Sequence, residues 1–480
     1  MGEAPVGSRH GEARAAPLRR ATAPFAGRGV LLLAVALGLA SAWLPWFVLK
    51  PNRLVVGQAA GLQQLDASLW WPLLVVWLAA AASAPWRAAA RLVAVPAAAV
   101  ATVLVVRAAA EGARLLALGE PSSARVSLGT GFWLALAACY VLWFAATRLA
   151  RGRNLVPPAA ALTAAFVVWL AAGGQFADLG LARELAAQGN DFRAELGRHL
   201  ALSGTSLLFG VAIGVPAAVA AHRRPAVAAW LLPTVAFFQT VPSLALFGLL
   251  LPLLARLGQG LSVGGALLLG LLLLPLAAYP RLPRPARWLV VVVAALPLLL
   301  WVTLLATIVA GAASALLGGA PVGVGLPRLG EPLAALGVRG IGAAPALIAL
   351  TLYSLLPIVR NAYEGLRGVP EAAVQAGRGM GMSGRQVLTR VELPLALPVM
   401  VAGVRGAAVL VVGITTVAFL IGAGGLGVFI QRGIDQVVPD LVLLGALPVI
   451  LLALLADAAL RALGALLTPR PLRRLGSHAR

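Results

Sequence analysis

The chain has 480 residues, of which 61% are hydrophobic and 11% are charged, and its formal net charge is +22. Soluble domains contain about 25% charged residues, so this composition excludes an ordinary soluble domain and predicts an all-α polytopic membrane protein. The apolar runs are continuous rather than alternating, which argues against a transmembrane β-barrel. The lone Cys139 excludes a disulfide framework and a multi-cysteine metal site.

Apolar stretches that match the ~20 residues of a membrane-crossing helix recur along the chain and predict about twelve transmembrane helices. We expect these spans at 29–49, 67–86, 88–109, 130–149, 155–173, 199–221, 226–257, 262–279, 287–311, 342–359, 399–421 and 440–467. The segment 226–257 is long and contains Pro233 and Pro242. It therefore predicts either one kinked span or a span followed by a re-entrant segment.

Arginines gather in the N-terminal tail, in short loops and in the C-terminal tail. Cytoplasmic loops of membrane proteins carry an excess of Lys and Arg, so both termini and the loop 360–398 are expected in the cytoplasm. The near-neutral segment 174–198 is expected outside. This placement explains the positive charge without a nucleic-acid partner.

The predicted organisation has five parts. They are a cytoplasmic Arg-rich tail over 1–28, a five-helix membrane module over 29–173, an external amphipathic segment over 174–198, a second membrane domain over 199–468 that contains the cytoplasmic loop 360–398, and a cytoplasmic basic tail over 469–480.

Polar side chains interrupt the seventh predicted span, where the segment 238–243 reads FQTVPS. Proline within a span frees backbone groups, which then need other hydrogen-bond partners or a water-filled cavity. Gln239, Thr240 and Ser243 are the candidates to supply those bonds. Lining of a translocation path and helix–helix packing with repair of the break both remain open for these three residues.

The cytoplasmic loop resembles the coupling loop of ABC importer permeases, whose pattern is E-A-A-x3-G-x9-I-x-L-P. Counting back from Leu393-Pro394 places Val391 and Gly381 on the pattern, and the triplet then falls on Gln375-Ala376-Gly377. The acidic position is therefore held by Gln375. Glu371 lies one helical turn upstream on a similar face and is expected to supply the missing charge.

The small residues of this loop suit a docking surface. Ala376, Gly377 and Gly381 are expected to form one face that docks closely onto another protein. Gly381 also permits a positive φ. Leu393-Pro394 is expected to end the helix and direct the chain back to the membrane.

Further segments extend the resemblance to permeases of osmoprotectant importers, which move glycine betaine, choline and related quaternary amines. They are 238–247 (FQTVPSLALF), 344–361, 379–398 and 421–427 (IGAGGLG). The segments 51–55 (PNRLV) and 127–134 (SLGTGFWL) resemble the YehY-type betaine permeases, which have an extended N-terminal membrane module.

The resemblance implies a type I (MetI-like) permease bundle over 199–468, in the bacterial cytoplasmic membrane, that serves uptake under osmotic stress. It also implies three protein partners: an ATP-binding subunit, an extracytoplasmic solute-binding protein and a second permease subunit in a homodimer. No Walker A sequence or H-E-x-x-H motif is present, so we expect no ATPase activity, catalytic residue, cofactor or metal in this chain. The 12 tryptophans fit interfacial belts, and the quaternary-amine cage is expected on the solute-binding protein.

The sequence alone leaves other functions open for this chain. One is an ABC permease for a different small solute, such as an amino acid. Another is an ion-driven secondary transporter, which needs acidic groups near the bilayer midplane, and Asp457 is its single candidate. A membrane-embedded enzyme would need clustered catalytic groups within the spans, and the sequence does not contain them.

Overall fold

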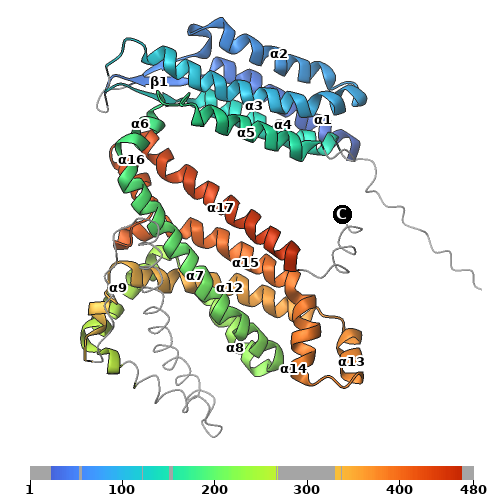
Figure 1. Cartoon of the computed structure of the whole chain (residues 1–480), viewed down its shortest axis with the longest axis vertical. Coiled ribbons are helices and arrows are strands. Elements are labelled where there is room, and N and C mark those ends of the chain that lie inside the picture. The colour runs from blue at the N-terminus through green and yellow to red at the C-terminus, as the bar shows by residue number, and fades with distance from the viewer. Residues whose placement is uncertain are drawn as a thin grey trace, which may run out of the picture. The chain divides into compact units, whose positions relative to one another are not determined.

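The computed structural model describes residues 23–52, 57–121, 123–150, 155–265, 268, 330–336 and 338–467. The chain divides into two compact units, Met1–Glu184 and Leu185–Arg480 (Figure 1). The predicted span 287–311, and 262–279 apart from 262–265 and 268, lie outside the described residues.

The described residues contain seven helices that are long and apolar enough to cross a membrane, in agreement with the predicted architecture. They are Arg87–Ala117, Thr130–Leu149, Gly189–Arg223, Ser243–Gly260, Ala343–Arg367, Gly384–Thr415 and Pro439–Leu467. Four shorter apolar helices accompany them: Gly27–Trp43, Ala67–Ser83, Val156–Ala172 and Pro225–Thr240.

The first unit is a helical bundle with an alanine-rich core. Helices α1 (Ala23–Ala40), α2 (Ala67–Ser83), α3 (Arg87–Ala117) and α4 (Thr130–Leu149) form a ring in which each packs against two others, and α5 (Val156–Ala172) packs against α3 (Figure 1). The buried face of α3 is built mainly from alanines. Small side chains let helix backbones approach closely, which stabilises packing in a membrane.

A three-stranded sheet caps this bundle, and the sequence analysis missed it. β1 (Phe47–Lys50) pairs antiparallel with β2 (Gln58–Ala60) and with β3 (Arg125–Leu128). The first span was expected to reach residue 49, but α1 ends at Ala40 and is followed by a 3₁₀ turn, η1 (Ser41–Trp43). Pro45 explains the difference, because a residue before proline is driven to extended geometry, and Leu44 has φ −95° and ψ 153°.

One buried and three partly exposed charged residues attach the chain after α5 to the sheet. Glu184, on α6 (Gly180–Ala187), is fully buried and accepts a hydrogen bond from Arg125 Nε of β3 at 3.5 Å. Arg183 Nη1 donates to the Ala124 carbonyl at 2.6 Å, and its Nη2 donates to Asp178 at 3.1 Å. A charge away from water is stable when it is paired and hydrogen-bonded, so these contacts hold the segment 178–184 in place.

The second unit is built around α12 (Ala343–Arg367). This helix packs against α7 (Gly189–Arg223), α8 (Pro225–Thr240), α9 (Ser243–Gly260) and α15 (Leu393–Thr415). About two thirds of its apolar window (67%) is buried, against 22–39% in the other candidate spans. A helix that is apolar on most sides has to be enclosed by others, so α12 forms the core of this unit.

α17 (Pro439–Leu467) completes the unit and packs against α15 and against α16 (Gly427–Asp435). Asp457 of α17 accepts hydrogen bonds from Arg405 Nε of α15 at 2.8 Å and from Arg461 of its own helix. Asp457 therefore joins two helices in an ion pair, which is the usual condition for charges inside a span.

The segment 226–257 is two helices. α8 ends at Thr240, α9 begins at Ser243, and Val241 and Pro242 between them have extended backbone, with ψ of 125° and 139°. Pro233 lies within α8 without ending it. The break at Pro242 forms one of the two parts of the candidate functional site; the other is the segment 371–394.

Candidate functional site

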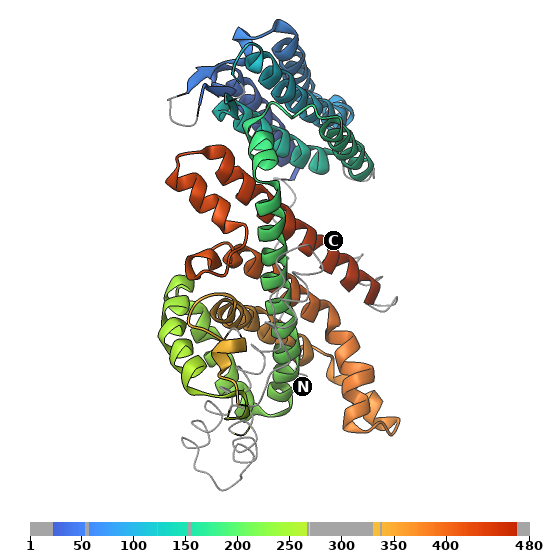
Figure 2. The ribbon, with the colours of Figure 1, turned by 60° about the vertical axis from the view of Figure 1, so that its left-hand side comes forward.

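Residues 371–394, which resemble a coupling loop and which we call the coupling segment, form a compact helical hairpin. α13 (Glu371–Gly379) is followed by a turn, by α14 (Gly384–Val387), by a π-helical turn η4 (Leu388–Glu392) and by the start of α15. Gly381 turns the chain with φ +80°, the left-handed conformation expected for it. Ser383 then caps α14 in a reciprocal pair of hydrogen bonds with Gln386. In Figure 2 the orange α13–α14 hairpin projects from one end of the second unit.

The small residues of α13 do not share one face, which corrects the sequence analysis. Val374 and Gly377 point inward, and a Cβ on Gly377 would lie 3.5 Å from Met382 and from Val391. Residues three apart on a helix share a face, so Gly377 goes with Val374. Ala376 is exposed instead, on the other side of the helix.

The exposed face of α13 carries its polar residues and ends in an apolar tip. Glu371, Gln375 and Ala376 are all exposed. Gln375 Nε2 donates to Glu371 Oε1 at 3.4 Å, so the carboxylate lies beside the position where the pattern has its acid. Met380, at the tip, is 71% exposed. The sequence analysis did not single out Met380, because one exposed apolar side chain is common on protein surfaces.

The helix does not end at Leu393-Pro394, so the expectation that this pair interrupts it was wrong. The chain stays helical from Gly384 to Thr415, and Pro394 is the second residue of α15, so its missing N–H removes one bond within this continuous helix. The π-helical turn η4 immediately before it pairs carbonyls with N–H groups five residues on. This wider turn lets the helix pass the proline.

The end of α7 holds the second arm of the hairpin. Arg223 Nη2 donates to the Gly384 carbonyl at 2.8 Å. His222 Nε2 lies 3.8 Å from Glu392 Oε1. Neither residue was recognised as part of the site from the sequence, where the basic residues of short loops served only to orient the spans.

The second part of the site is a pair of hydrogen bonds between two proline breaks. Pro357 of α12 has no N–H to give to the Tyr353 carbonyl four residues earlier. Gln239 Nε2 of α8 donates to that carbonyl at 3.2 Å. In return, the Tyr353 hydroxyl donates to the carbonyl of Val241, next to Pro242. We call this arrangement the proline clamp.

The three polar candidates of the seventh span, Gln239, Thr240 and Ser243, therefore have different environments. Gln239 repairs a helix in the proline clamp, which is the packing alternative. Thr240 is exposed, and its hydroxyl donates to Phe237 O of its own helix at 2.7 Å. Ser243 is half-buried at the first residue of α9. Only Gln239 among the three contacts α12 by a hydrogen bond that the described structure shows.

Two family models match the chain. Residues 210–469 match the binding-protein-dependent transport system inner membrane component. Residues 27–182 match the N-terminal domain of the ABC transporter permease YehY.

Relatives and solved structures give further similarity. Carnitine transport permease protein OpuCB of Listeria monocytogenes is 30% identical over 285 residues, which cover 59% of this chain and 92% of that protein. Osmoprotectant import permease protein OsmW of Salmonella typhimurium is 44% identical over 169 residues, which cover 35% and 78%. Choline transport system permease protein OpuBB of Bacillus subtilis is 43% identical over 136 residues, which cover 28% and 63%. A structure of the MetNI methionine ABC transporter in inward-facing conformations has a TM-score of 0.33 at 20% identity, over 55% of this chain and 92% of that one.

The proline clamp predicts a clear stability effect. Gln239→Leu keeps the side-chain size but leaves the Tyr353 carbonyl unpaired, so the free energy of unfolding should fall by about 1–3 kcal/mol. Tyr353→Phe should have a similar effect through Val241. Thr240→Val is the matched control and should change stability by less than about 0.5 kcal/mol. Unfolding in mixtures of SDS and mild detergent measures all three, and equal stability of Gln239→Leu and Thr240→Val would contradict the clamp.

Proposed function

The chain belongs to the family of binding-protein-dependent transport system inner membrane components, which makes it a permease of an ABC importer, and we propose that its cargo is an osmoprotectant such as glycine betaine. The proposed solute is supported by the similarity to permeases of carnitine, choline and osmoprotectant transport systems. Carnitine and choline share a trimethylammonium group. The ion-driven secondary transporter is excluded by family membership.

The partners follow from the family in general terms: an ATP-binding subunit and a solute-binding protein. In detail, we propose that the ATP-binding subunit docks on the exposed face of α13, through Glu371, Gln375 and Ala376 with Met380 at the tip. Gly377, Val391 and Leu393 support that face from behind, because Gly377 packs against Val391 inside the hairpin. ATP hydrolysis takes place on the partner. A second copy of this chain completes the membrane pore.

The permease is a multi-pass protein of the bacterial inner membrane. Within it, we propose that 29–173 is an N-terminal membrane module, that 199–468 is the permease domain, and that the coupling segment lies in the cytoplasm with both termini. The segment 174–198 then lies outside. This arrangement is supported by α7, whose first residues belong to that segment and whose last residues contact the coupling segment at Gly384.

Cysteine labelling tests this orientation. In a Cys139→Ala background, Arg378→Cys places a thiol on the exposed surface of α13, and Ala186→Cys places one on the exposed surface of α6. A membrane-impermeant maleimide applied to intact cells should label only the Ala186→Cys protein, and both proteins should react after the cells are opened. The reverse pattern in intact cells would invert the topology.

The docking face predicts the effect of a charge on α13. Ala376→Arg should leave folding and insertion intact, because Ala376 is exposed on a helix. Uptake and co-purification of the ATP-binding subunit should both fall about tenfold or more, since an unpaired charge buried in an interface costs about 2–5 kcal/mol. Ala186→Arg makes the same change on exposed α6 and is the matched control. Normal co-purification with the Ala376→Arg protein would remove α13 from the interface.

The same assay addresses the acidic position. Glu371→Ala should weaken uptake, and the loss should be smaller when Gln375→Glu restores the acid of the family pattern. Such a departure from additivity is the mark of coupled residues. Additive losses would show that Glu371 does not substitute for the missing acid.

Uptake into proteoliposomes that contain the full transporter tests the solute and the path together. Glycine betaine, choline and carnitine should accumulate in an ATP-dependent manner, and uptake of an amino acid instead would replace the proposed cargo. We also propose that Thr240 and Ser243 line the translocation path at the Pro242 break. Thr240→Val should then change uptake kinetics or solute preference per folded complex, at unchanged stability. Kinetics identical to those of the parent would remove Thr240 from the path.

A further inference from the structure

Three charged residues lie together within the spans of the second unit, where α15 packs against α17 (Figure 1). Asp457 of α17 accepts hydrogen bonds from Arg405 of α15 and from Arg461 of its own helix. The Nε and Nη2 atoms of Arg405 both lie against the same carboxylate oxygen, at 2.8 and 2.7 Å. We call these three residues the charged triad. Two cations share one anion, so the triad carries one unbalanced positive charge.

The charged triad lies too deep in the spans for its arginines to reach the membrane surface. Arg405 stands near the middle of α15 (Leu393–Thr415), about 18 Å from one end and about 15 Å from the other. A side chain at that depth does not extend to the interface. Arg461 lies nearer the end of α17, but its guanidinium bonds to Asp457, one turn deeper in the same helix. The positive charge is therefore held inside the span.

The charged triad is also exposed on the surface of the unit. The side chains of Arg405 and Asp457 are 30% and 24% exposed, and that of Arg461 is 67% exposed. Beside them, Ala402 and Gly406 of α15 are exposed, and a Cβ on Gly406 would have no neighbour within 4 Å. Lipid chains do not solvate a charge, and charged side chains in spans face protein or a water-filled cavity. This face of α15 and α17 is therefore unsuited to lipid.

A second copy of the unit has no free acid to match the charged triad in a dry contact. In α7, α8, α9, α12, α15 and α17, the acids other than Asp457 lie within two turns of a helix end; they are Asp191, Glu195, Glu364 and Asp440. The sequence from 261 to 330 contains none. An uncompensated charge in an interface without water is costly. The triad therefore needs water or an anionic ligand beside it.

Arg461 has the chemistry to bind a carboxylate. Its Nη2 donates to Asp457, and the described residues give no acidic partner to its Nε and Nη1. A guanidinium matches a carboxylate through two parallel N–H···O bonds. We propose that the face of α15 and α17 lines the water-filled translocation path, and that Arg461 binds the carboxylate of a solute passing along it. The existence of a path rests on the proposed function. Glycine betaine carries such a carboxylate, whereas choline ends in a hydroxyl.

Thiol labelling tests whether water reaches this face. Leu454 lies one helical turn before Asp457 and shares its face, whereas Leu455 lies two residues before Asp457 and does not. The two leucines are 63% and 55% exposed, and their depths are nearly equal. In a Cys139→Ala background, a hydrophilic maleimide should label the Leu454→Cys transporter in nanodiscs about tenfold faster than the Leu455→Cys transporter, because the reactive thiolate forms in water and not in lipid.

Two results of this labelling would overturn the proposal. Equal rates for the Leu454→Cys and Leu455→Cys proteins would show that the two sides of α17 have the same surroundings. A disulfide between two copies of the Leu454→Cys protein, formed in place of labelling, would show a dry interface instead of a path.

Uptake of two matched solutes tests the carboxylate contact. Arg461→Gln should lower the ratio of glycine betaine uptake to choline uptake about tenfold, as expected for one lost charge-assisted hydrogen bond. The solute-binding protein is the same in all variants, so a change in this ratio belongs to the permease. Arg432→Gln removes an arginine from another pair with an aspartate, Asp191, and should leave the ratio unchanged. A parental ratio in the Arg461→Gln protein would remove the contact.

The choice of solutes separates this inference from the proposed function. Glycine betaine uptake with an unchanged ratio would leave the osmoprotectant permease standing and overturn the Arg461 contact. If the transporter accumulates only amino acids, the proposed cargo fails, and the uptake of an amino acid relative to its amide takes the place of the first ratio. Arg461→Gln should lower that ratio too, because the carboxylate is the group that the two kinds of solute share.

Discussion

Backbone hydrogen bonding inside a membrane is the constraint on which the second unit depends. A carbonyl in a span that has no N–H to accept from must find another donor, because no water is present to supply one. Pro357 creates such a carbonyl at Tyr353, in the most enclosed helix of the unit, and Pro242 interrupts the neighbouring span. Gln239 donates a hydrogen bond to the Tyr353 carbonyl, and the Tyr353 hydroxyl donates one to the Val241 carbonyl beside Pro242. These two bonds hold α8 and the start of α9 against α12.

The coupling segment takes its position from the same core. Only residues 368–370 separate α12 from α13, and the second arm of the hairpin runs on into α15, which packs against α12. Val374 and Gly377 lock the arms together, and Arg223 ties the second arm to α7. A displacement of α13 is therefore passed to three helices at once, with little slack in the hairpin. The proposed docking of the ATP-binding subunit on α13 relies on this rigidity.

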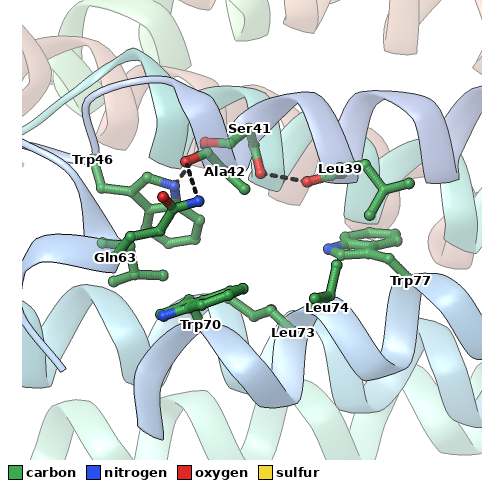
Figure 3. Close-up of a pocket in the computed structure, with 11 residues that line it drawn as sticks. Leu39, Ser41, Ala42, Trp46, Gln63, Trp70, Leu73, Leu74 and Trp77 are labelled. Atoms are coloured by element: carbon green, nitrogen blue, oxygen red, sulfur yellow. Dashed lines mark hydrogen bonds between the residues drawn. The ribbon is translucent and has the colours of Figure 1, made fainter. Parts of the chain in front are cut away.

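The first unit uses different means. Alanine-rich helices pack closely, a short sheet caps them, and the ion pair of buried Glu184 with Arg125 holds the following segment. Tryptophans expected only as interfacial belts meet here around one small hollow (Figure 3), because Trp46 arrives from the chain after α1 while Trp70 and Trp77 lie two turns apart on α2. Spacing of seven residues places those two on one helix face, but nothing in the sequence brings Trp46 to them.

The sequence by itself determined the membrane class, most spans and the glycine turn of the segment 371–394, because these depend on local properties: apolar length, charge bias, and the conformational freedom of Gly381. Tertiary structure decided what depends on distant neighbours. Gly377 faces inward against Val391, because the inner face of α13 is defined only once α14 and η4 pack on it. The tertiary structure also carried the helix through Pro394 by a π-helical turn, and it gave Gln239 its partner, because a carbonyl 114 residues away is close only in the folded bundle. The sheet of the first unit likewise joins strands whose pairing no local pattern specifies.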